Sequence, residues 1–543
     1  DDLGVYEDKI YKKTLGCTAL WLASMNKDTN MLTWLIAKGA NVNYITSNRC
    51  TALMNACRHG NLAATIVLLE HGAIVDLEDY MGRTALSHAV KSHFITLELI
   101  KAGACIDITD CKNMAAIHYA VLQNQPSTVL LLIKHGANSR GKTNSGFNLL
   151  KIACINGCLH MFNCLLQWVD WTPRDIRDAQ LLMGAVCVNE YREYSLAFSV
   201  WRKAVAIHIL EDEESTQQYP RAIFKDAREI QTLEDIERIQ GDMREVRIQS
   251  VLICERVLGY DCRELFHQLL FAGINFADAY DYRTCIRIWN SAMSLVLNKK
   301  VQVNDIMHLG RAIIKLLIQI LQLKGTIKGQ IPFEALFQTL SLLVSYLSRL
   351  LSEGDHHTSV EYIMRLILCN LHFVFLLEPS EEENQSLMIV LYKLVQMNPK
   401  TLCGLNFLMA AIKHDSEFLK EFSASEIEEL KIFSNPTIVH AILKVGANVD
   451  DTNRRGTTAV YLASCPETYN ESVLNMLIEY GAHLDQRDYF GRSALDNLEK
   501  INRLDLRKCV SLKCIAAKAV KQNNVAFNTE NFPNAIIDFI KKH

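Results

Sequence analysis

The stretch that most strongly suggests chemistry is HGANSRGKTNSG, from His135 to Gly146. Gly136 is followed by four residues and then by Gly141, Lys142 and Thr143, which matches the G-x-x-x-x-G-K-[ST] pattern of a phosphate-binding loop. Such a loop requires a buried strand before it and a helix after it, since amides at the helix N-terminus hold the phosphates. Read alone, the apolar run TVLLLIKHG before Ala137 resembles that strand. The sequence around it must therefore show whether the run is a strand or a helix.

Those neighbours are periodic. Four stretches open with TALWLA, TALMNA, TALSHA and AAIHYA, and each later reaches a Gly-Ala pair. They begin at Thr18, Thr51, Thr84 and Ala115, which are 33, 33 and 31 residues apart. This pattern resembles the ankyrin repeat, whose period is about 33 residues. Thr then caps a first helix, Gly supplies the left-handed residue after a second helix, and Asn or Asp fits the turn of a finger.

The repeat register removes the phosphate-binding interpretation. TVLLLIKHG aligns with ITLELIKAG one period earlier and with ATIVLLEHG two periods earlier, and these are the second helices of ankyrin units. Gly136 is therefore expected at a helix C-terminus, and Gly141, Lys142 and Thr143 in the following finger. We expect no nucleotide to bind there.

The periodicity extends beyond these four units. A degraded fifth unit runs from Asn148 to Trp168, and the pattern returns near the C-terminus. There, one degraded unit opens at Asn406 and closes at Asp450, a clear unit runs from Thr457 to Asp485, and a last unit begins at Arg492. Two ankyrin arrays are thus expected to flank a different middle region.

The middle region, Thr172 to Pro399, has helical periodicity and little strand patterning. Leu181 to Ile207 and Leu269 to Leu295 each read as small residue, polar turn, aromatic residue and Trp-containing second helix, which resembles the tetratricopeptide repeat. Polar loops are expected at Glu211 to Pro220 and at Glu378 to Gln385. Val360 to Leu377 is apolar but interrupted by charged and polar residues, which favours a buried helix over a membrane span.

The expected fold class is all-α. The expected segments are an N-terminal ankyrin array at 1–171, a tetratricopeptide-like region at 172–300, a helical linker at 301–398, a second ankyrin array at 399–500 and docking helices at 501–543. Because the chain begins at Asp1 without Met, we expect a processed or partial sequence.

Composition narrows the function further. The net charge is 57 − 60 = −3, which gives no reason to expect a nucleic-acid partner. The 17 cysteines include no C-x-x-C pair, so they read as reduced thiols and favour the cytoplasm or nucleus. No metal-ligand spacing, nucleophile motif or paired carboxylate is present to indicate an enzyme, a metal or a cofactor.

The C-terminal stretch Ser511 to His543 contains an amphipathic helix pattern. Leu512, Ile515, Ala516 and Ala519 share one face, with Cys514 at its edge, and a second apolar segment follows Pro533. These residues fit either a cap on the second ankyrin array or a helix that docks into another protein. Periodicity alone leaves both interpretations open.

A family resemblance bears on that choice. The pattern Ser-Leu-x-Cys-x-Ala-Ala-x-Ala-Val, starting at Ser511, is similar to the von Hippel–Lindau box. The order of arrays, together with ICERVLG, FAGINFADAYDYRTCIRIW and TALWLAS, resembles the feminization-1 homologue (Fem-1-like) family. This resemblance implies that Leu512, Cys514, Ile515, Ala516 and Ala519 dock onto elongin C. It also implies that the second element selects cullin-2 through Phe532, Pro533 and Ile536.

The resemblance implies a non-catalytic substrate receptor of a ubiquitin ligase. Elongin C with elongin B, cullin-2 and its RING subunit would be partners, and target proteins would be bound by their C-terminal tails in the ankyrin groove. Neither nucleic acid nor a membrane is an expected partner. An ankyrin and tetratricopeptide scaffold with no ligase link is the alternative.

The groove residues differ from the family pattern. Relatives typically read Cys-Phe/Tyr-Asp-Gly where this chain has Cys57-Arg58-His59-Gly60, and Ile10 stands where they carry another acid. Acidic residues in the family hold a terminal Arg, so the substitution predicts altered tail specificity, with Arg58 suited to a carboxylate. The groove residues expected from this comparison are Trp21, Cys50, Asn55, Arg58, His59, Asp79, Tyr80 and His88.

Overall fold

A computed structural model describes residues 17–26, 29–207, 223–224, 227–260, 262–296, 303–354, 357–413, 416–430 and 433–501. Over these residues the regular elements are helices, and one isolated β-bridge joins Thr452 and Thr458. The predicted all-α class is confirmed. The chain divides into two compact units, Asp1–Ala272 and Gly273–His543, and each is described separately.

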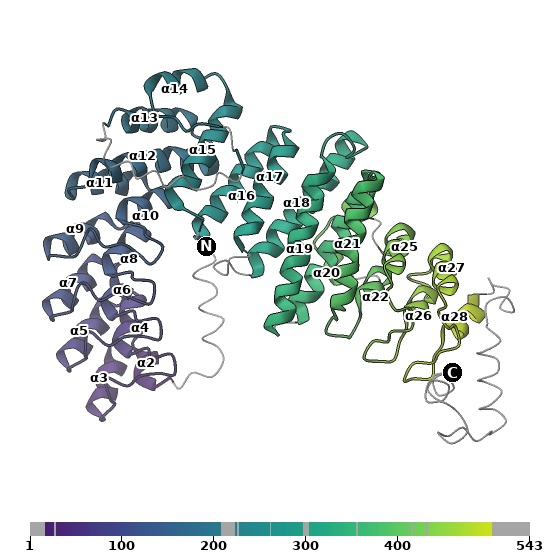
Figure 1. Ribbon diagram of the computed structural model, residues 1–543. Coiled ribbons are helices and arrows are strands. Elements are labelled where there is room, and N and C mark those ends of the chain that lie inside the picture. Colours follow the sequence, from purple (N-terminus) through teal and green to yellow (C-terminus); the bar gives the residue numbers. More distant parts are fainter. Residues whose placement is uncertain are drawn as a thin grey trace. The chain divides into compact units, whose positions relative to one another are not determined.

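The N-terminal unit begins with stacked helix pairs (Figure 1). The pairs are α2 (Ala19–Ala23) with α3 (Asn30–Ala37), α4 (Ala52–Arg58) with α5 (Leu62–Glu70), α6 (Ala85–Ala89) with α7 (His93–Lys101), α8 (Ala116–Leu122) with α9 (Pro126–Lys134), and α10 (Leu149–Ile155) with α11 (Leu159–Trp168). First helices pack on first helices of neighbouring pairs, and second helices pack on second helices. This is the stacking expected of ankyrin units, including the degraded fifth one.

The repeated residues act largely as predicted. The Thr51 hydroxyl accepts a hydrogen bond from the Met54 amide at 3.2 Å, and Thr18 caps α2 in the same way. Thr84 makes no such side-chain bond. Gly72 has a φ of 80° just after α5, where a side chain would be strained, and Gly39, Gly103 and Gly136 at the same repeat position share this geometry.

The segment around Lys142 is an ankyrin finger, as the register predicted. The residues before it form helix α9, and Gly136 follows that helix with a φ of 89°. Asn113 of the preceding finger donates a hydrogen bond to the Lys142 carbonyl at 2.6 Å. The strand that a phosphate-binding loop requires is replaced by a helix.

The rest of the N-terminal unit is also helical. Its elements are α12 (Pro173–Val186), a π-helical turn η1 (Cys187–Tyr191), α13 (Tyr194–Val205), α14 (Leu233–Ile239), α15 (Met243–Leu258) and the start of α16 (Arg263–Asp278). The Trp201 indole donates to the Leu181 carbonyl at 3.0 Å and covers Gly184, where a Cβ would lie 2.3 Å from Nε1. The small residue therefore allows the aromatic second helix to pack closely. The loop expected at Glu211 to Pro220 lies outside the described residues.

Arg256 on α15 forms ion pairs with residues that are distant from it in the sequence. The adjacent Glu255 reads as its partner in sequence, but neighbouring helical residues face different directions. In the structure Arg256 binds Glu229 at 2.8 Å and Asp178 of α12 at 2.6 Å. Lys151 of α10 donates to the Val257 carbonyl at 3.0 Å, so α15 is attached to both α10 and α12.

The C-terminal unit starts with long helices. They are α17 (Tyr282–Val296), α18 (Val303–Lys324), α19 (Phe333–Glu353), α20 (His357–Leu376) and α21 (Glu381–Met397). A Cβ on Gly273 would lie 2.0 Å from Nε1 of Trp289 on α17, the same small–aromatic contact as at Gly184. The second predicted helix pair is therefore present.

The prediction of a polar loop at Glu378 to Gln385 is wrong from Glu381 onward, because α21 begins there. The Ser380 hydroxyl accepts from the Glu383 amide, and the Glu383 carboxylate accepts from the Ser380 amide at 2.8 Å. This reciprocal capping box starts the helix, and acidic residues in its first turn suit the helix dipole.

Three helices of this unit are long and apolar enough to cross a membrane by length and composition: Asp305–Lys324, Phe333–Glu353 and Thr358–Leu376. The most apolar window of the third is 72% buried inside the structure. Helix α20 packs against α18, α19, α22 and α25, and its Arg365 is buried with the guanidinium bonded to the Ala410 carbonyl. Its apolar surface is thus used for packing within the unit.

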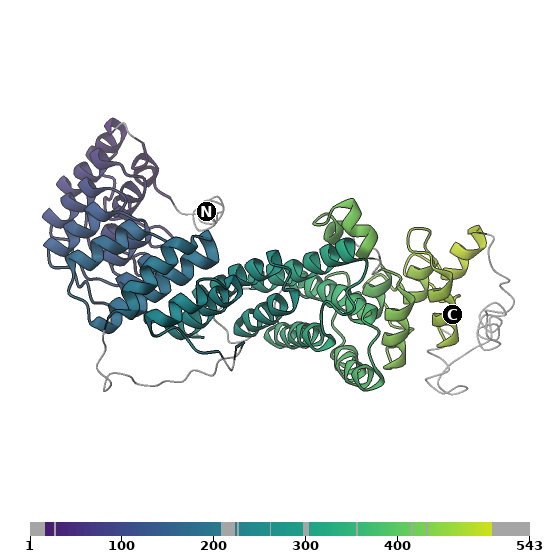
Figure 2. The same ribbon diagram turned by 90° about the horizontal axis from the view of Figure 1, so that it is seen from above.

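The second ankyrin array follows (Figure 2, yellow-green). Its helices are α22 (Phe407–Ile412), α25 (Pro436–Lys444), α26 (Ala459–Ser464), α27 (Glu471–Glu479) and α28 (Ala494–Ile501). Two short helices, α23 (Ser416–Leu419) and α24 (Ala424–Leu430), are inserted between α22 and α25 and lengthen the degraded unit. Even so, α22 packs on both α25 and α26, as in a regular array.

Candidate functional site

Each ankyrin finger is closed by one side chain, which we call the anchor residue. In every case its oxygen accepts a hydrogen bond from the amide four residues later. The anchor residues are Thr46, Asp79, Asp110, Thr143, Thr401, Asn453 and Asp488. Fingers are also joined to their neighbours by main-chain bonds, such as that from the Cys111 amide to the Met81 carbonyl at 2.8 Å. The inner helices and fingers therefore present a fixed surface.

Asp79 is the most heavily bonded of the predicted groove residues. Its Oδ1 accepts from the amides of Met81 and Arg83, at 2.8 and 2.9 Å. Its Oδ2 binds Nε of Arg83 at 2.9 Å and lies 3.1 Å from Nε2 of His88 on α6. The carboxylate is buried, and both oxygens are used within the finger and its helix.

The electrostatics of this cluster follow from burial and from these bonds. Burial alone would raise the pKa of Asp79, but the hydrogen bond from His88 and those from Arg83 outweigh it and lower the pKa. Burial lowers the pKa of His88, and the nearby positive charges of Arg58 and Arg83 add to this, against the opposing bond to Asp79. Both shifts favour a neutral imidazole whose Nε2–H donates a hydrogen bond to the ionised Asp79 carboxylate.

Three other predicted groove residues lie beneath the surface. Trp21, Cys50 and Asn55 are all buried. The Asn55 amide donates to the Trp21 carbonyl at 2.9 Å and to the Ser24 hydroxyl at 3.0 Å, which fixes α4 against the preceding unit. Their position supports the groove and gives a ligand little access to them.

The predicted groove residues that a ligand can reach are Arg58, His59 and Tyr80. Arg58 ends α4 and is half-buried, whereas His59 is exposed and its Nδ1 donates to the Asn55 carbonyl at 2.9 Å. The Tyr80 side chain is 58% exposed at the tip of the finger. Tyr80 thus offers an aromatic face to a ligand, and Arg58 offers positive charge.

Sequence reasoning missed Lys91, which is exposed. Lys91 lies 33 residues after Arg58, one repeat period, so the two occupy equivalent repeat positions, Arg58 at the end of α4 and Lys91 just after α6. Applying the period to each groove residue would have found it. Arg58 and Lys91 thus add positive charge to an array in which the buried carboxylate of Asp79 is already paired with Arg83.

The predicted elongin-docking and cullin-docking residues, from Leu512 to Ile536, lie outside the described residues. Within the part of the chain that the structure describes, no group of three His, Cys, Asp or Glu side chains is placed to hold a metal ion.

The comparisons with known proteins agree with this architecture. The family described as "Ankyrin repeats (3 copies)" matches residues 20–110 and 94–175. Protein fem-1 homolog A from Danio rerio is 24% identical over 67% of this chain, and that from Homo sapiens is 25% identical over 67%. Protein fem-1 homolog A-like from Mus musculus is 23% identical over 97% of this chain and 77% of its own length. The chain is thus similar to Fem-1 homologues over most of its length.

The match covers only part of the length of the first two Fem-1 relatives. The chain spans 61% of the zebrafish relative and 56% of the human one. The ankyrin array and the similarity to Fem-1 homologues together suggest a protein-interaction adaptor.

Proposed function

We propose that this chain is the substrate-recognition subunit of a cullin-2–elongin ubiquitin ligase. It would bind C-terminal tails of target proteins in the ankyrin groove and promote their ubiquitination and proteasomal degradation. The observation that carries the proposal is the sequence SLKCIAAKAV from Ser511 to Val520, similar to a von Hippel–Lindau box, in a chain that is similar to Fem-1 homologues. Elongin C with elongin B, cullin-2 and its RING subunit are the proposed partners, and they supply the catalysis.

A pull-down tests this assignment. Elongin C and cullin-2 co-purify with the intact chain and are lost from a variant carrying Leu512→Ala and Cys514→Ala, because the box no longer fills its docking site. Unchanged circular dichroism shows that the fold survives. Failure of the intact chain to retain either protein contradicts the proposal.

The inner surface supports a preference for acidic tails or for the terminal carboxylate itself. A tail ending in Arg needs a free carboxylate in the groove, and Asp79 already binds Arg83 and His88. Arg58 and Lys91 instead offer positive charge at equivalent repeat positions. Guanidinium and ammonium groups form charge-assisted hydrogen bonds with carboxylates.

Peptide binding tests the preference. The intact chain binds a tail with acidic residues before its C-terminus more tightly than the same tail ending in Arg. Arg58→Gln with Lys91→Gln weakens this binding by at least about tenfold, because each charge-assisted contact that is lost costs about that factor. Lys101→Gln, on the second helix α7, serves as the matched control. Tighter binding of the Arg-ended tail, unaffected by the double variant, contradicts the preference.

The alternative is an ankyrin and tetratricopeptide scaffold with no ligase link, in which the C-terminal helices cap the second array. Loss of elongin C binding in the pull-down distinguishes the two functions. The many buried free thiols favour action in the cytoplasm and nucleus, and the proposed function requires no cofactor.

A further inference from the structure

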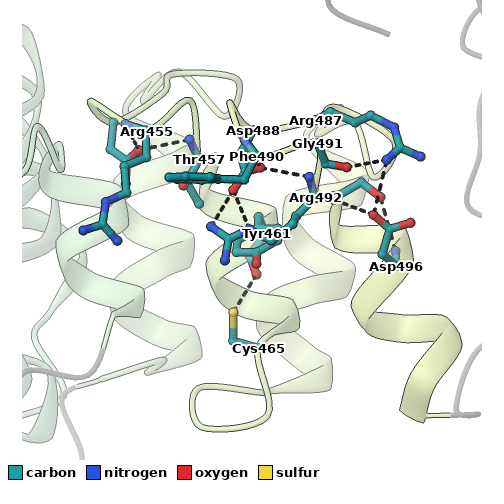
Figure 3. A network of polar contacts seen from close by, with 12 residues as sticks. Arg455, Thr457, Tyr461, Cys465, Arg487, Asp488, Phe490, Gly491, Arg492 and Asp496 are labelled. Carbon is teal, nitrogen blue, oxygen red and sulfur yellow. Dashed lines mark hydrogen bonds and ion pairs between the residues drawn. The ribbon is translucent and has the colours of Figure 1, made fainter.

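The last two described fingers of the second array carry an exposed cluster of arginines and aromatic rings (Figure 3). One finger precedes α26, and the other precedes α28. The cluster consists of Arg454, Arg455, Arg487, Tyr489, Phe490 and Arg492, all exposed, and we call it the arginine–aromatic surface. Tyr489 and Phe490 are 78% and 68% exposed, so two adjacent aromatic rings face solvent beside the arginines.

The backbone beneath this surface is fixed. Asn453 anchors one finger and Asp488 the other, through bonds to the amides of Thr457 and Arg492 at 3.0 and 2.9 Å. The Tyr489 amide donates to the Arg455 carbonyl at 3.0 Å, and the Tyr489 ring lies against Gly456, where a Cβ would be 3.0 Å from it. The two finger tips therefore form one rigid surface.

Arg492 is held in place on three sides. Its guanidinium binds Oδ2 of Asp488 at 2.7 Å, and its central carbon lies 5.6 Å from the Tyr461 ring centroid and 5.0 Å from that of Phe490 (Figure 3). Stacking on Arg492 orients the exposed Phe490 ring. A partner thus meets a preorganised ring and loses little side-chain entropy.

The charge of the surface is positive. The Asp488 side chain is 1% exposed and is used by Arg492, and Asp496 lies 3.7 Å from Arg487. Among the described residues, the guanidinium groups of Arg454 and Arg455 have no ion pair. Two cations at the tip of one finger therefore remain available beside two exposed aromatic rings.

We infer that the arginine–aromatic surface binds an acidic segment of a partner protein that also presents an apolar side chain. Two guanidinium groups match two carboxylates, and Tyr, Phe and Arg are the residue types that dominate protein interfaces. A nucleic acid needs more cations, because about 6–10 phosphate contacts are typical of strong binding. This surface is separate from the first array and does not depend on the proposed ligase role.

The chain's own C-terminal segment is a poor occupant. Residues 502–543 contain eight Lys or Arg and three Asp or Glu, so like charges would meet. A second protein with the opposite charge fits better, since complementary charge speeds association and excludes wrong partners.

Fluorescence anisotropy with the full chain tests the inference. The probe is a short labelled peptide in which glutamates flank a Leu-Phe pair, and the same peptide with glutamine in place of glutamate is the reference. The glutamate peptide binds at least about tenfold more tightly than the glutamine peptide. Arg454→Gln with Arg455→Gln removes this difference, and Phe490→Ala weakens both peptides.

The matched control is Arg238→Gln with Arg244→Gln, which removes two exposed arginines from the N-terminal unit. This variant binds like the unmodified chain, and thermal unfolding shows that all variants are folded. Three outcomes overturn the inference: no glutamate-dependent binding, an equal loss in the control variant, or tighter binding of a single-stranded oligothymidine with the same arginine dependence.

Discussion

Replacing Asp79 by Asn tests whether the buried carboxylate holds the second finger to helix α6. Asn keeps an oxygen for the amides of Met81 and Arg83, but its amide group faces Arg83 Nε and His88 Nε2, where Oδ2 accepts at 2.9 and 3.1 Å. Hydrogen bonds to charged groups contribute about 1.5–3 kcal/mol each. Because Arg83 keeps 13% of its side chain exposed and regains some hydration, we expect the lower end, about 3 kcal/mol in all.

Asp110 provides the matched comparison. Its Oδ1 accepts from the amides of Lys112 and Met114, at 2.9 and 2.8 Å, as Asp79 does in its own finger. Its Oδ2 binds only the Tyr119 hydroxyl, at 2.6 Å, among the described side chains. Asp110→Asn replaces one hydrogen bond to a charged group by a neutral hydrogen bond. We therefore expect the free energy of unfolding to fall by about 1 kcal/mol.

Urea unfolding of both variants measures the two losses, and hydrogen exchange of residues 79–90 locates the first one, because repeat arrays open locally. Asp79→Asn speeds exchange in this region far more than Asp110→Asn does. Equal losses in the two variants, or a loss below about 1 kcal/mol for Asp79→Asn, refute the reasoning.

Three further outcomes follow from buried groups. Gly273→Ala costs at least about 1–3 kcal/mol in urea unfolding, since its Cβ meets a tryptophan ring, whereas Gly241→Ala, with open space around it, changes stability by less than about 0.5 kcal/mol. Burial lowers the pKa of His88 and His118 in the folded chain, so their stabilisation is present above about pH 6.5 and is lost as pH falls below it. The thermal midpoint of the N-terminal unit therefore falls between pH 7 and pH 5, and a constant midpoint refutes this. Arg365→Met leaves a buried carbonyl without its charged donor and lowers stability by about 3 kcal/mol, measured by urea unfolding.

The sequence predicted the helix pairs because ankyrin units repeat at a fixed period and end at glycine. The contact of a tryptophan with a small residue was readable for the same reason, at Gly184 and Trp201. The start of α21 was missed because a run of acids reads as a solvated loop, although Ser380 and Glu383 have the spacing of a capping box. The inserted helices α23 and α24 interrupt the period, so no repeat pattern could reveal them.

The candidate site was predicted less completely. The family resemblance placed Asp79 and His88 in the groove, but it could not show that they bind each other, because that contact joins a finger to a helix nine residues later. Nor could it separate the accessible Arg58 from the buried Asn55, since exposure depends on how the neighbouring unit packs. The repeat period of 33 residues, counted from Arg58, does lead to Lys91.

The anchor residues have a consequence for how binding specificity changes over evolution. Each finger depends on one side chain for its closure, and the residues at its tip make no comparable demand on the fold. The tips have accordingly diverged, as in Met81, Lys112, Cys403, Arg455 and Phe490, while the anchors remain Thr, Asp or Asn. New recognition surfaces can therefore arise, or be grafted by design, through exchange of tip residues alone, with little loss of folding stability.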